Sequence, residues 1–522
     1  MNFIKKNYFS FFLFFFIFFG SIYSTKVGIT HDEFHDYNVW NANKNLILNF
    51  FSNKNFDTSY LLEGGKFYGV GFHYISTLIE FFISELPILK DYNTLGKNIL
   101  SKHVTVFLLF VVSGLFFKNI IKLITRNKFH ANLSTIFYLF YPYLLGHSFF
   151  NIKDIPFLTF WLICTYFNIK LIQNYFLIKK FKKKYLILLS FFTAYLLSIR
   201  ISGILIFVQY LIFIVTFLNM KKLNFLSFIK SNFKLIIFNF LFIFIFFFIL
   251  QPSYWDNPLL IFDSIKYMSN HIQTVCTTTL GECMKAQNLP ASYLPIWFFF
   301  KLPIIIIIGT VLYFLVEKKI QKSFLTHHTL ASLIFSTLSV IFLLILFNVN
   351  LYDEIRQVMF LVPLIFIFSL SNIYFFSKIF FYIISIFYMI FFITQNLLLF
   401  PYNYVWINNF SHLTKVQNTF ELDYWGASTM NVSKFLKKDL KSTNNCVISN
   451  RNQSIKSLAP NIKCLIDFDK LHEKNNRPFY VVLLERNLNK GTPNNCILVM
   501  VEQRKLNFSS EKLNLAKVFK CD

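Results

Sequence analysis

The sequence predicts an all-α polytopic membrane protein of about eleven transmembrane helices, followed by a small α/β domain outside the membrane. Three observations lead to this prediction. Apolar runs of about 20 residues, the length that crosses a bilayer, recur through the first 400 residues. Lysine and arginine cluster between alternate runs, which is typical of cytoplasmic loops. After residue 400 the apolar runs shorten to the length of strands.

The composition favours the same class of protein. The chain has 522 residues, of which 55% are hydrophobic and 20% aromatic, and its mean hydropathy is +0.51. The formal net charge is +26. Because no basic and aromatic nucleic-acid-binding module is visible, we assign this charge to positive-inside orientation and to contact with anionic membrane lipids. Nucleic acid is therefore not expected as a partner.

The first apolar run, 8–23, follows Lys5 and Lys6, which place the N-terminus in the cytoplasm. A signal peptide is the alternative, but no clean pair of small residues marks a cleavage site, so we favour an uncleaved first helix. The mixed segment 70–89 is expected to be an interfacial or re-entrant helix on the outer face. The further spans are expected at about 101–121, 131–150, 156–178, two within 185–218, 235–250, 294–315, 330–347, 358–370 and 374–400.

This order of spans gives two domains. Residues 1–400 form the transmembrane domain, with outer loops at 29–100 and 252–293, and residues 401–522 form a soluble extracytoplasmic (periplasmic) domain. The protein is expected to be integral to the cell (inner or plasma) membrane. The strands of the second domain are predicted near 446–448, 464–466, 479–484, 496–501 and 516–519.

The cysteines agree with this sidedness. The long outer loop contains two, and the outer tail contains four. Even numbers allow disulfides in an oxidising compartment, and free buried thiols remain equally open. None has the spacing to histidine of a zinc site. The remaining cysteine, within a span, is expected to be an apolar filler. The residues are Cys276 and Cys283 in the loop, Cys446, Cys464, Cys496 and Cys521 in the tail, and Cys164 in the span.

Polar side chains gather at the ends of the spans on the outer side. The densest cluster contains Asp32 and Glu33, directly after the first span. Charged groups at a membrane are costly to hold near lipid and are usually functional, although a single loop charge is more often merely solvated. Their number on one face favours a site. The other members are His147, Lys153, Asp154, Arg200, Trp255, Tyr352, Asp353 and Arg356.

These residue types suit glycosyl transfer from a lipid phosphate. Asp32 or Glu33 could act as a general base toward an attacking hydroxyl, and Asp154 could orient the acceptor or stabilise positive charge on the sugar. Basic side chains could hold the donor phosphate, because arginine binds phosphate in a bidentate way and lysine acts as a point charge. The expected phosphate ligands are Arg356, Arg200 and Lys153, and the expected substrate contacts are His147, Tyr352, Asp353 and Trp255.

The ordered set of motifs resembles the membrane glycosyltransferases of the GT-C fold. It is most similar to bacterial relatives of the dolichyl-phosphate-mannose–protein mannosyltransferases (glycosyltransferase family 39), and more distantly to the aminoarabinose–lipid A transferases. The matching features run through most of the chain. They are Asp32-Glu33, Gly146-His147, Lys153-Asp154-Ile155-Pro156, Ser198 to Gly203, Trp255 to Pro258, Leu294-Pro295, Tyr352-Asp353-Glu354-Ile355-Arg356, with Glu354 in place of the glycine of a Tyr-Asp-Gly-x-Arg pattern, and Phe420 to Gly426.

The resemblance implies an inverting transfer of a sugar from a polyprenyl-phosphate donor to a hydroxyl of a lipid, glycan or protein acceptor. It places the acidic pair near the acceptor and the arginine near the donor phosphate. Asp32, Glu33 and Asp154 could also hold Mg²⁺ or Mn²⁺, but the relatives mostly manage the phosphate with basic side chains, so no metal or other cofactor is favoured. Two alternatives stay open: a transporter or flippase of lipid-linked saccharides, and an O-antigen ligase or polymerase.

Overall fold

The structure is a computed structural model of the full chain. It describes residues 2–52, 61, 64–270, 274–440, 445–468, 478–484, 493, 495–506 and 511–521.

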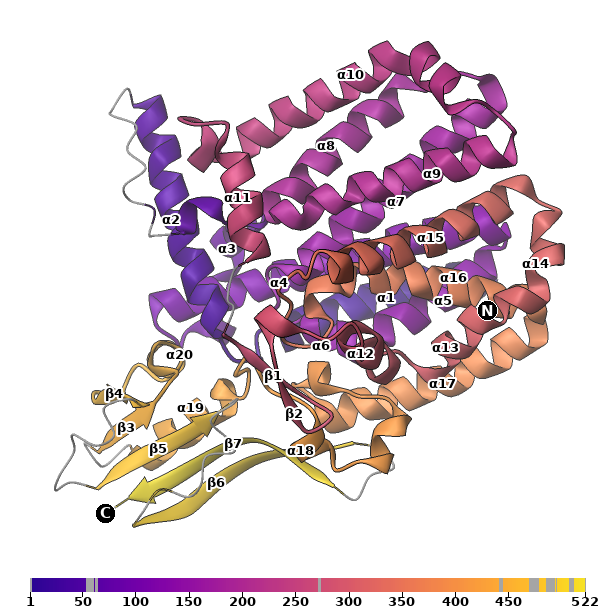
Figure 1. Ribbon diagram of the computed structural model, residues 1–522. Helices are drawn as coiled ribbons and strands as arrows, with labels where there is room; N and C mark the ends of the chain where they lie inside the picture. The colour runs from indigo at the N-terminus through magenta and orange to yellow at the C-terminus, as the bar shows by residue number, and fades with distance from the viewer. Residues whose placement is uncertain are drawn as a thin grey trace.

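The first four fifths of the chain form a bundle of helices (Figure 1). The helices are α1 (Asn2–Ser24), α2 (His31–Phe51), α3 (Gly71–Ile83), α4 (Thr94–Thr125), α5 (Lys128–Phe140), α6 (Pro142–His147), α7 (Asp154–Ile178), α8 (Lys183–Ile199), α9 (Ile206–Met220), α10 (Phe225–Leu250), α11 (Leu260–Ser269), α12 (Tyr293–Lys301), α13 (Ile304–Val311), α14 (Tyr313–Gln321), α15 (Phe324–Leu346), α16 (Val362–Phe376) and α17 (Lys378–Leu399). Short 3₁₀ turns join several of them, including η4 (Ile201–Leu205), η5 (Pro252–Tyr254) and η7 (Arg356–Leu361).

Every apolar run that the sequence predicts as a span is helical, but the count of spans differs. Within the described residues, eight helices are long and apolar enough to cross a membrane, and a ninth span results if α12 and α13 are counted together. These two helices meet at an angle of 113°. Of the two remaining expected spans, one is α5, which ends after 13 residues before Pro142, and the other is α8, with 17 residues. The apolar helices indicate an integral membrane protein.

The bundle has a protein-covered centre and a periphery that is left to lipid. Helix α7 and the segment Arg356–Phe376 are 89% and 94% buried along their apolar windows, whereas α10 is only 11% buried. The exposed side of α10 is formed by large apolar side chains, among them Phe240 and Phe244. Such a surface is stable in a bilayer and not in water, because about half of each of these phenylalanine side chains stays exposed on the protein surface.

Two helices outside the spans cover the end of the bundle at which the first span exits. Helix α3 has 13 residues and is too short to span, in agreement with an interfacial helix in 70–89. Helix α2 begins with a capping box, in which the Glu33 carboxylate accepts hydrogen bonds from the backbone N–H and the hydroxyl of Thr30. In Figure 1, α2 runs across the left-hand ends of the spanning helices.

The tail folds as the expected mixed domain. Its five-stranded sheet has the order β4-β3-β5-β7-β6, with β3 parallel to β4 and β5, and β7 antiparallel to β5 and β6. The strands are β3 (Cys446–Ser449), β4 (Leu465–Asp467), β5 (Phe479–Leu484), β6 (Cys496–Lys505) and β7 (Lys512–Cys521), and the helices of this part are α18 (Val416–Thr419), α19 (Thr429–Asp439) and α20 (Asn452–Leu458). The predicted strands of the tail are confirmed.

Six cysteines form three disulfides, which resolves the alternatives that the sequence left open. The pairs are Cys276–Cys283, Cys446–Cys464 and Cys496–Cys521, and the remaining described cysteine, Cys164, is a buried free thiol. Cys276 and Cys283 join a separate two-stranded hairpin, β1 (Cys276–Thr279) and β2 (Glu282–Lys285).

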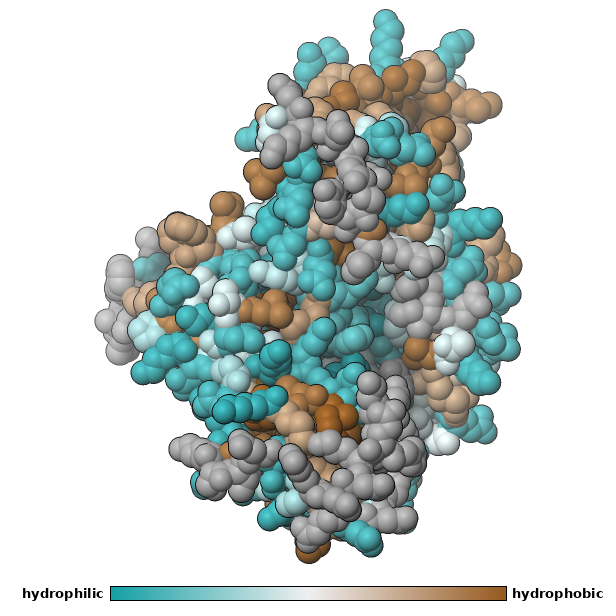
Figure 2. All heavy atoms as spheres, turned by 90° about the vertical axis from the view of Figure 1, so that its left-hand side faces the viewer, coloured by the Kyte–Doolittle hydropathy of each residue, from teal (hydrophilic) through white to brown (hydrophobic). Residues whose placement is uncertain are grey.

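The sheet domain and the hairpin lie at one end of the helix bundle (Figure 1). The N-terminus lies at the opposite end. Figure 2 shows the left-hand side of Figure 1: hydrophilic side chains dominate the middle of this face, and hydrophobic ones gather toward its upper part. The polar residues singled out in the sequence sit at this end, where the spanning helices give way to loops.

Candidate functional site

A cavity of about 340 Å³ lies where α2, the start of α7 and the turns before η4 and η7 converge. One part of its wall is polar and the other part is apolar. The polar part consists of His31, Asp32, His35, Tyr68, Lys153, Arg200, Ser202, Asn350, Tyr352, Arg356 and Gln357. The apolar part includes Phe67, Ile199, Ile201, Leu205, Met268, Leu344, Val349, Leu351, Val358 and Phe360.

The first turn of α2 separates the two acids that are adjacent in the sequence. Asp32 lines the cavity. Glu33 is rotated away, because its carboxylate caps the helix and lies 2.6 Å from Nε2 of the buried His103. Of the two acids that the sequence offers as a general base, Asp32 is therefore the one that lines the cavity. Glu33 holds the start of α2 in place and does not reach the cavity.

The Asp32 carboxylate belongs to the polar part of the cavity wall. It makes no ion pair within 4 Å among the described residues, and its side chain is half-buried at the cavity wall. Burial by itself would raise the pKa of Asp32, but the positive charges of Lys153 and Arg356 outweigh it and leave this pKa below its usual value. The carboxylate is thus ionised at neutral pH.

Lys153 is held over the same face of α2. Its Nζ lies 2.8 Å from Oδ1 of Asp36 and 4.4 Å from the centre of the Tyr68 ring. Asp36 is one helical turn after Asp32, so both carboxylates project from one side of the helix. The ion pair fixes a cation beside the free acid.

Asp154, at the start of α7, binds two arginines. Its Oδ1 accepts a hydrogen bond from Nη1 of Arg200, and its Oδ2 lies 3.6 Å from Nη1 of Arg356. Asn151 also donates to Oδ2, at 2.9 Å. Asp154 is buried and does not line the cavity. It therefore orients the two arginine side chains and does not face the cavity.

The Arg356 side chain is held by contacts to an acid and to two aromatic rings. Its Nε and Nη2 lie 3.2 and 3.0 Å from Oδ2 of Asp353. Its guanidinium also packs on the rings of Tyr352 and Trp425, at 4.9 and 4.5 Å from their centres. A buried arginine fixed in this way presents its remaining N–H groups in one direction, as binding of a phosphate requires.

Three of the four expected substrate contacts do not line the cavity. His147 is fully buried, and its Nδ1 is 3.0 Å from Nδ2 of Asn151, so it supports Asp154 through that amide. Trp255 donates its indole N–H to the carbonyl oxygen of Phe248 and does not line the cavity. Asp353 acts on Arg356, and among the four expected contacts Tyr352 alone lines the cavity.

The densest polar cluster of the sequence, residues 30–37, contains His35 and Asp36, but sequence reasoning gave neither residue a role, and it missed Tyr68 and Gln357. The spacing of Asp32 and Asp36, four residues apart in an acidic stretch, is a helical signal that could have identified the second acid. No signal in the sequence points to Tyr68 or Gln357.

The three carboxylates considered for a divalent cation do not converge. Glu33 is directed to His103, and Asp154 is covered by two arginines. The described residues contain no group of three or more His, Cys, Asp or Glu side chains arranged to bind a metal ion.

Searches for related proteins identify the fold and leave the family open. No protein-family model matches the chain, and no curated protein matches its sequence. The chain is similar in structure to ArnT from Cupriavidus metallidurans in the apo state, with a TM-score of 0.50 at 9% identity over 98% of both chains. The same enzyme bound to undecaprenyl phosphate gives 0.46 at 11% identity, again over 98% of both chains. ArnT is an aminoarabinose–lipid A transferase, so the fold expected from the sequence resemblance is confirmed.

Proposed function

We propose that this protein is a membrane glycosyltransferase that moves a sugar from a polyprenyl-phosphate donor to a hydroxyl acceptor. The observation that carries the proposal is the composition of the cavity. The Asp32 carboxylate, which makes no ion pair within 4 Å among the described residues, shares the cavity with Lys153, Arg200 and Arg356, and a large part of the remaining wall is apolar. Such a cavity matches a lipid phosphate that bears a sugar, because the basic side chains can bind the charged phosphate and the apolar side chains can contact the hydrocarbon chain.

The reaction follows from these positions. Asp32 accepts the proton of the acceptor hydroxyl as its oxygen attacks the anomeric carbon. The bond between that carbon and the phosphate oxygen breaks, and the polyprenyl phosphate leaves with the electron pair. Arg356, Arg200 and Lys153 stabilise the negative charge on the departing phosphate. Attack from the side opposite the leaving group inverts the configuration at the anomeric carbon.

The same proposal includes the orientation of the protein. The basic loops favour a cytoplasmic N-terminus, which places the cavity and the domain 401–522 on the extracytoplasmic side of the inner or plasma membrane, with 1–400 as the transmembrane domain. ArnT, with which this chain shares its fold, has been crystallised with undecaprenyl phosphate, and a polyprenyl-phosphate donor is part of this proposal. The acceptor is a lipid, a glycan or a protein.

The position of the charged residues favours transfer over transport. A transporter of lipid-linked saccharides binds its substrate near the middle of the membrane. Here Asp32, Lys153, Arg200 and Arg356 all lie at ends of helices. An O-antigen ligase or polymerase, the other alternative, relies on a large outer loop rich in Arg and His, and the expected loop 252–293 has no such composition.

The test uses the purified protein in nanodiscs with a panel of radiolabelled polyprenyl-phosphate sugars. We expect release of polyprenyl phosphate from one donor, lost by about 100-fold or more in Asp32→Asn. The matched control is Asp256→Asn, an exposed acid outside the cavity, which should react as the wild type does. Full activity of Asp32→Asn would refute the assignment of the base. Tight saccharide-lipid binding without release from any donor would favour transport.

A further inference from the structure

The turn before Arg356 has an unusual backbone. Asp353 and Glu354 both have positive φ angles, 57° and 66°. Residues with a Cβ atom rarely adopt this left-handed conformation, and two in succession persist only where the surroundings hold them. The geometry of Arg356, three residues after Asp353, therefore depends on what fixes this turn.

Two hydroxyl groups hold the turn from outside. The backbone N–H of Asp353 donates to Oγ1 of Thr277 at 2.9 Å, and the N–H of Glu354 donates to the hydroxyl of Tyr293 at 3.1 Å. Thr277 is fully buried. Since the carboxylate of Asp353 in turn binds Arg356, a chain of contacts leads from Thr277 through Asp353 to the guanidinium.

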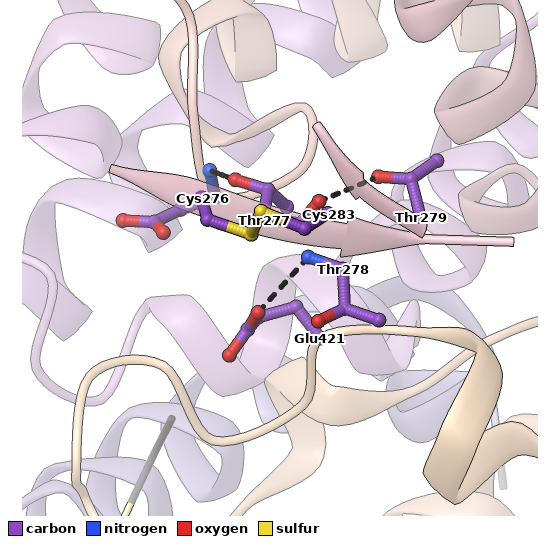
Figure 3. The surroundings of a disulfide bond; sticks show 7 residues. Cys276, Thr277, Thr278, Thr279, Cys283 and Glu421 are labelled. Carbon is purple, nitrogen blue, oxygen red and sulfur yellow. Dashed lines mark hydrogen bonds between the residues drawn. A yellow bond between two sulfur atoms is a disulfide. The ribbon is translucent and has the colours of Figure 1, made fainter. Parts of the chain in front are cut away.

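Thr277 belongs to the hairpin β1–β2, which the Cys276–Cys283 disulfide closes (Figure 3). The hairpin is fixed to its surroundings on both sides. Thr278 and Glu421 exchange two hydrogen bonds, in which the Thr278 N–H donates to Glu421 Oε2 at 3.1 Å and the Glu421 N–H donates to the Thr278 carbonyl at 2.9 Å. Thr279 accepts a hydrogen bond from the indole of Trp297 at 3.0 Å. The hydroxyl that meets Asp353 thus comes from a covalently closed and anchored element.

We propose that this hairpin positions Arg356 for the lipid phosphate and that Thr277 is the positioning residue through which it acts. The disulfide keeps Thr277 at the distance at which it holds the backbone of Asp353. This inference rests on the proposed function for the identity of the ligand. It adds that the affinity for the phosphate is set partly by a residue that does not line the cavity.

The test measures binding of a polyprenyl phosphate to the protein in nanodiscs, together with KM and kcat for the active donor. Thr277→Val keeps the shape of the side chain and leaves the N–H of Asp353 without its acceptor. We expect about tenfold weaker binding and a KM raised by the same factor, which corresponds to about 1.4 kcal/mol. Thr277→Ser restores the acceptor and should bind as the wild type does.

The matched control is Thr279→Val in the same hairpin. Thr279 is equally buried, and its replacement removes the hydrogen bond from Trp297 and the one that Thr279 donates to the Thr277 carbonyl oxygen at 3.3 Å. The Thr277 hydroxyl that holds Asp353 stays in place, because Thr279 does not touch Asp353. This variant should unfold at a lower temperature and keep its affinity for the phosphate. The double variant Cys276→Ser/Cys283→Ser should weaken binding as Thr277→Val does, whereas Cys446→Ser/Cys464→Ser, which removes a disulfide in the tail, should not.

The outcomes separate this inference from the proposed function. Suppose that the wild type binds polyprenyl phosphate. If Thr277→Val then binds it with the same affinity, or if Thr279→Val loses as much affinity as Thr277→Val, the positioning role alone is overturned. Absence of polyprenyl-phosphate binding by the wild type would overturn the proposed function and the inference together.

Discussion

Replacing Lys301 with methionine should destabilise this protein more than replacing its partner, Glu354. The Lys301 Nζ lies 2.8 Å from Oε1 of Glu354, and both side chains are fully buried. Lys301 also donates to the carbonyl oxygens of Tyr404 and Trp406 at 3.3 and 3.0 Å. Among the described residues, the Glu354 carboxylate has Lys301 as its only ion-pair partner. Loss of Lys301 therefore leaves a buried acid alone, whereas loss of Glu354 leaves the lysine with two acceptors.

The expected size of the effect follows from the burial of the pair. At 2.8 Å two unit charges attract each other by about 6 kcal/mol with an effective dielectric constant of 20. Much of this attraction is offset by the cost of removing both groups from water, which raises the pKa of Glu354 to about 8 even beside Lys301. Breaking a buried pair by removing one partner typically costs about 3–5 kcal/mol. Glu354→Gly also relieves the left-handed backbone, worth about 1–2 kcal/mol. The double variant Lys301→Met/Glu354→Gly should thus regain at least about 2 kcal/mol relative to Lys301→Met.

The assay is thermal unfolding in detergent, and unfolding is monitored through the reaction of Cys164 with a thiol-reactive dye as this residue becomes exposed. Cys164 is buried and is the free cysteine of the described part of the chain. At about 2 °C per kcal/mol, Lys301→Met should lower Tm by about 6–10 °C. The exposed Lys318→Met is the matched control and should shift Tm by less than about 1 °C. A Tm of Lys301→Met close to that of the wild type, or a double variant no more stable than the single one, would refute the reasoning.

Three further predictions concern the cavity and the start of α2. Arg356→Lys should reduce kcat/KM by about 10-fold to 100-fold, since lysine cannot keep both contacts to Asp353 while facing a phosphate. Steady-state kinetics with the active donor would measure this reduction. An unchanged kcat/KM would contradict phosphate binding by Arg356. The rate should be constant from pH 7 down to about pH 5, because the pKa of Asp32 lies below the usual 3.8 and the acid stays ionised over this range. The stability that this ionised acid contributes is present above 3.8 and is lost as the pH falls through its folded pKa. An acid limb near pH 6 in a pH–rate profile would contradict this. Glu33→Gln should lower the free energy of unfolding by about 1–3 kcal/mol, because the Glu33 carboxylate contacts His103, but it should leave kcat per folded molecule nearly unchanged. Thermal unfolding and steady-state kinetics measure the two effects. A loss of kcat as large as that of Asp32→Asn would indicate that Glu33 is catalytic.

Much of the site could be predicted because each of its members follows or precedes an apolar run. Asp32, Lys153, Arg200 and Arg356 are polar residues at helix ends, and alternating spans bring every second end to the same side of a membrane. Chain order and hydropathy are therefore enough to bring them near one another. They do not determine the direction in which each side chain points, so Glu33 could not be distinguished from Asp32 until the capping of α2 was known.

The sequence by itself determined the helical membrane bundle, the strands of the tail and the polar end of the molecule. The physical reason is that these features depend on local sequence. An apolar run of about 20 residues is stable as a helix in lipid, and short alternating runs are stable as strands once they pair in a sheet. The tertiary structure alone decided which side chains meet. The ion pair of Lys301 with Glu354, the bond from Asp353 to Thr277 and the pairing of the cysteines join residues from 7 to 76 positions apart. Such contacts depend on how the helices pack and on where a buried charge finds its partner, and no local pattern contains that information.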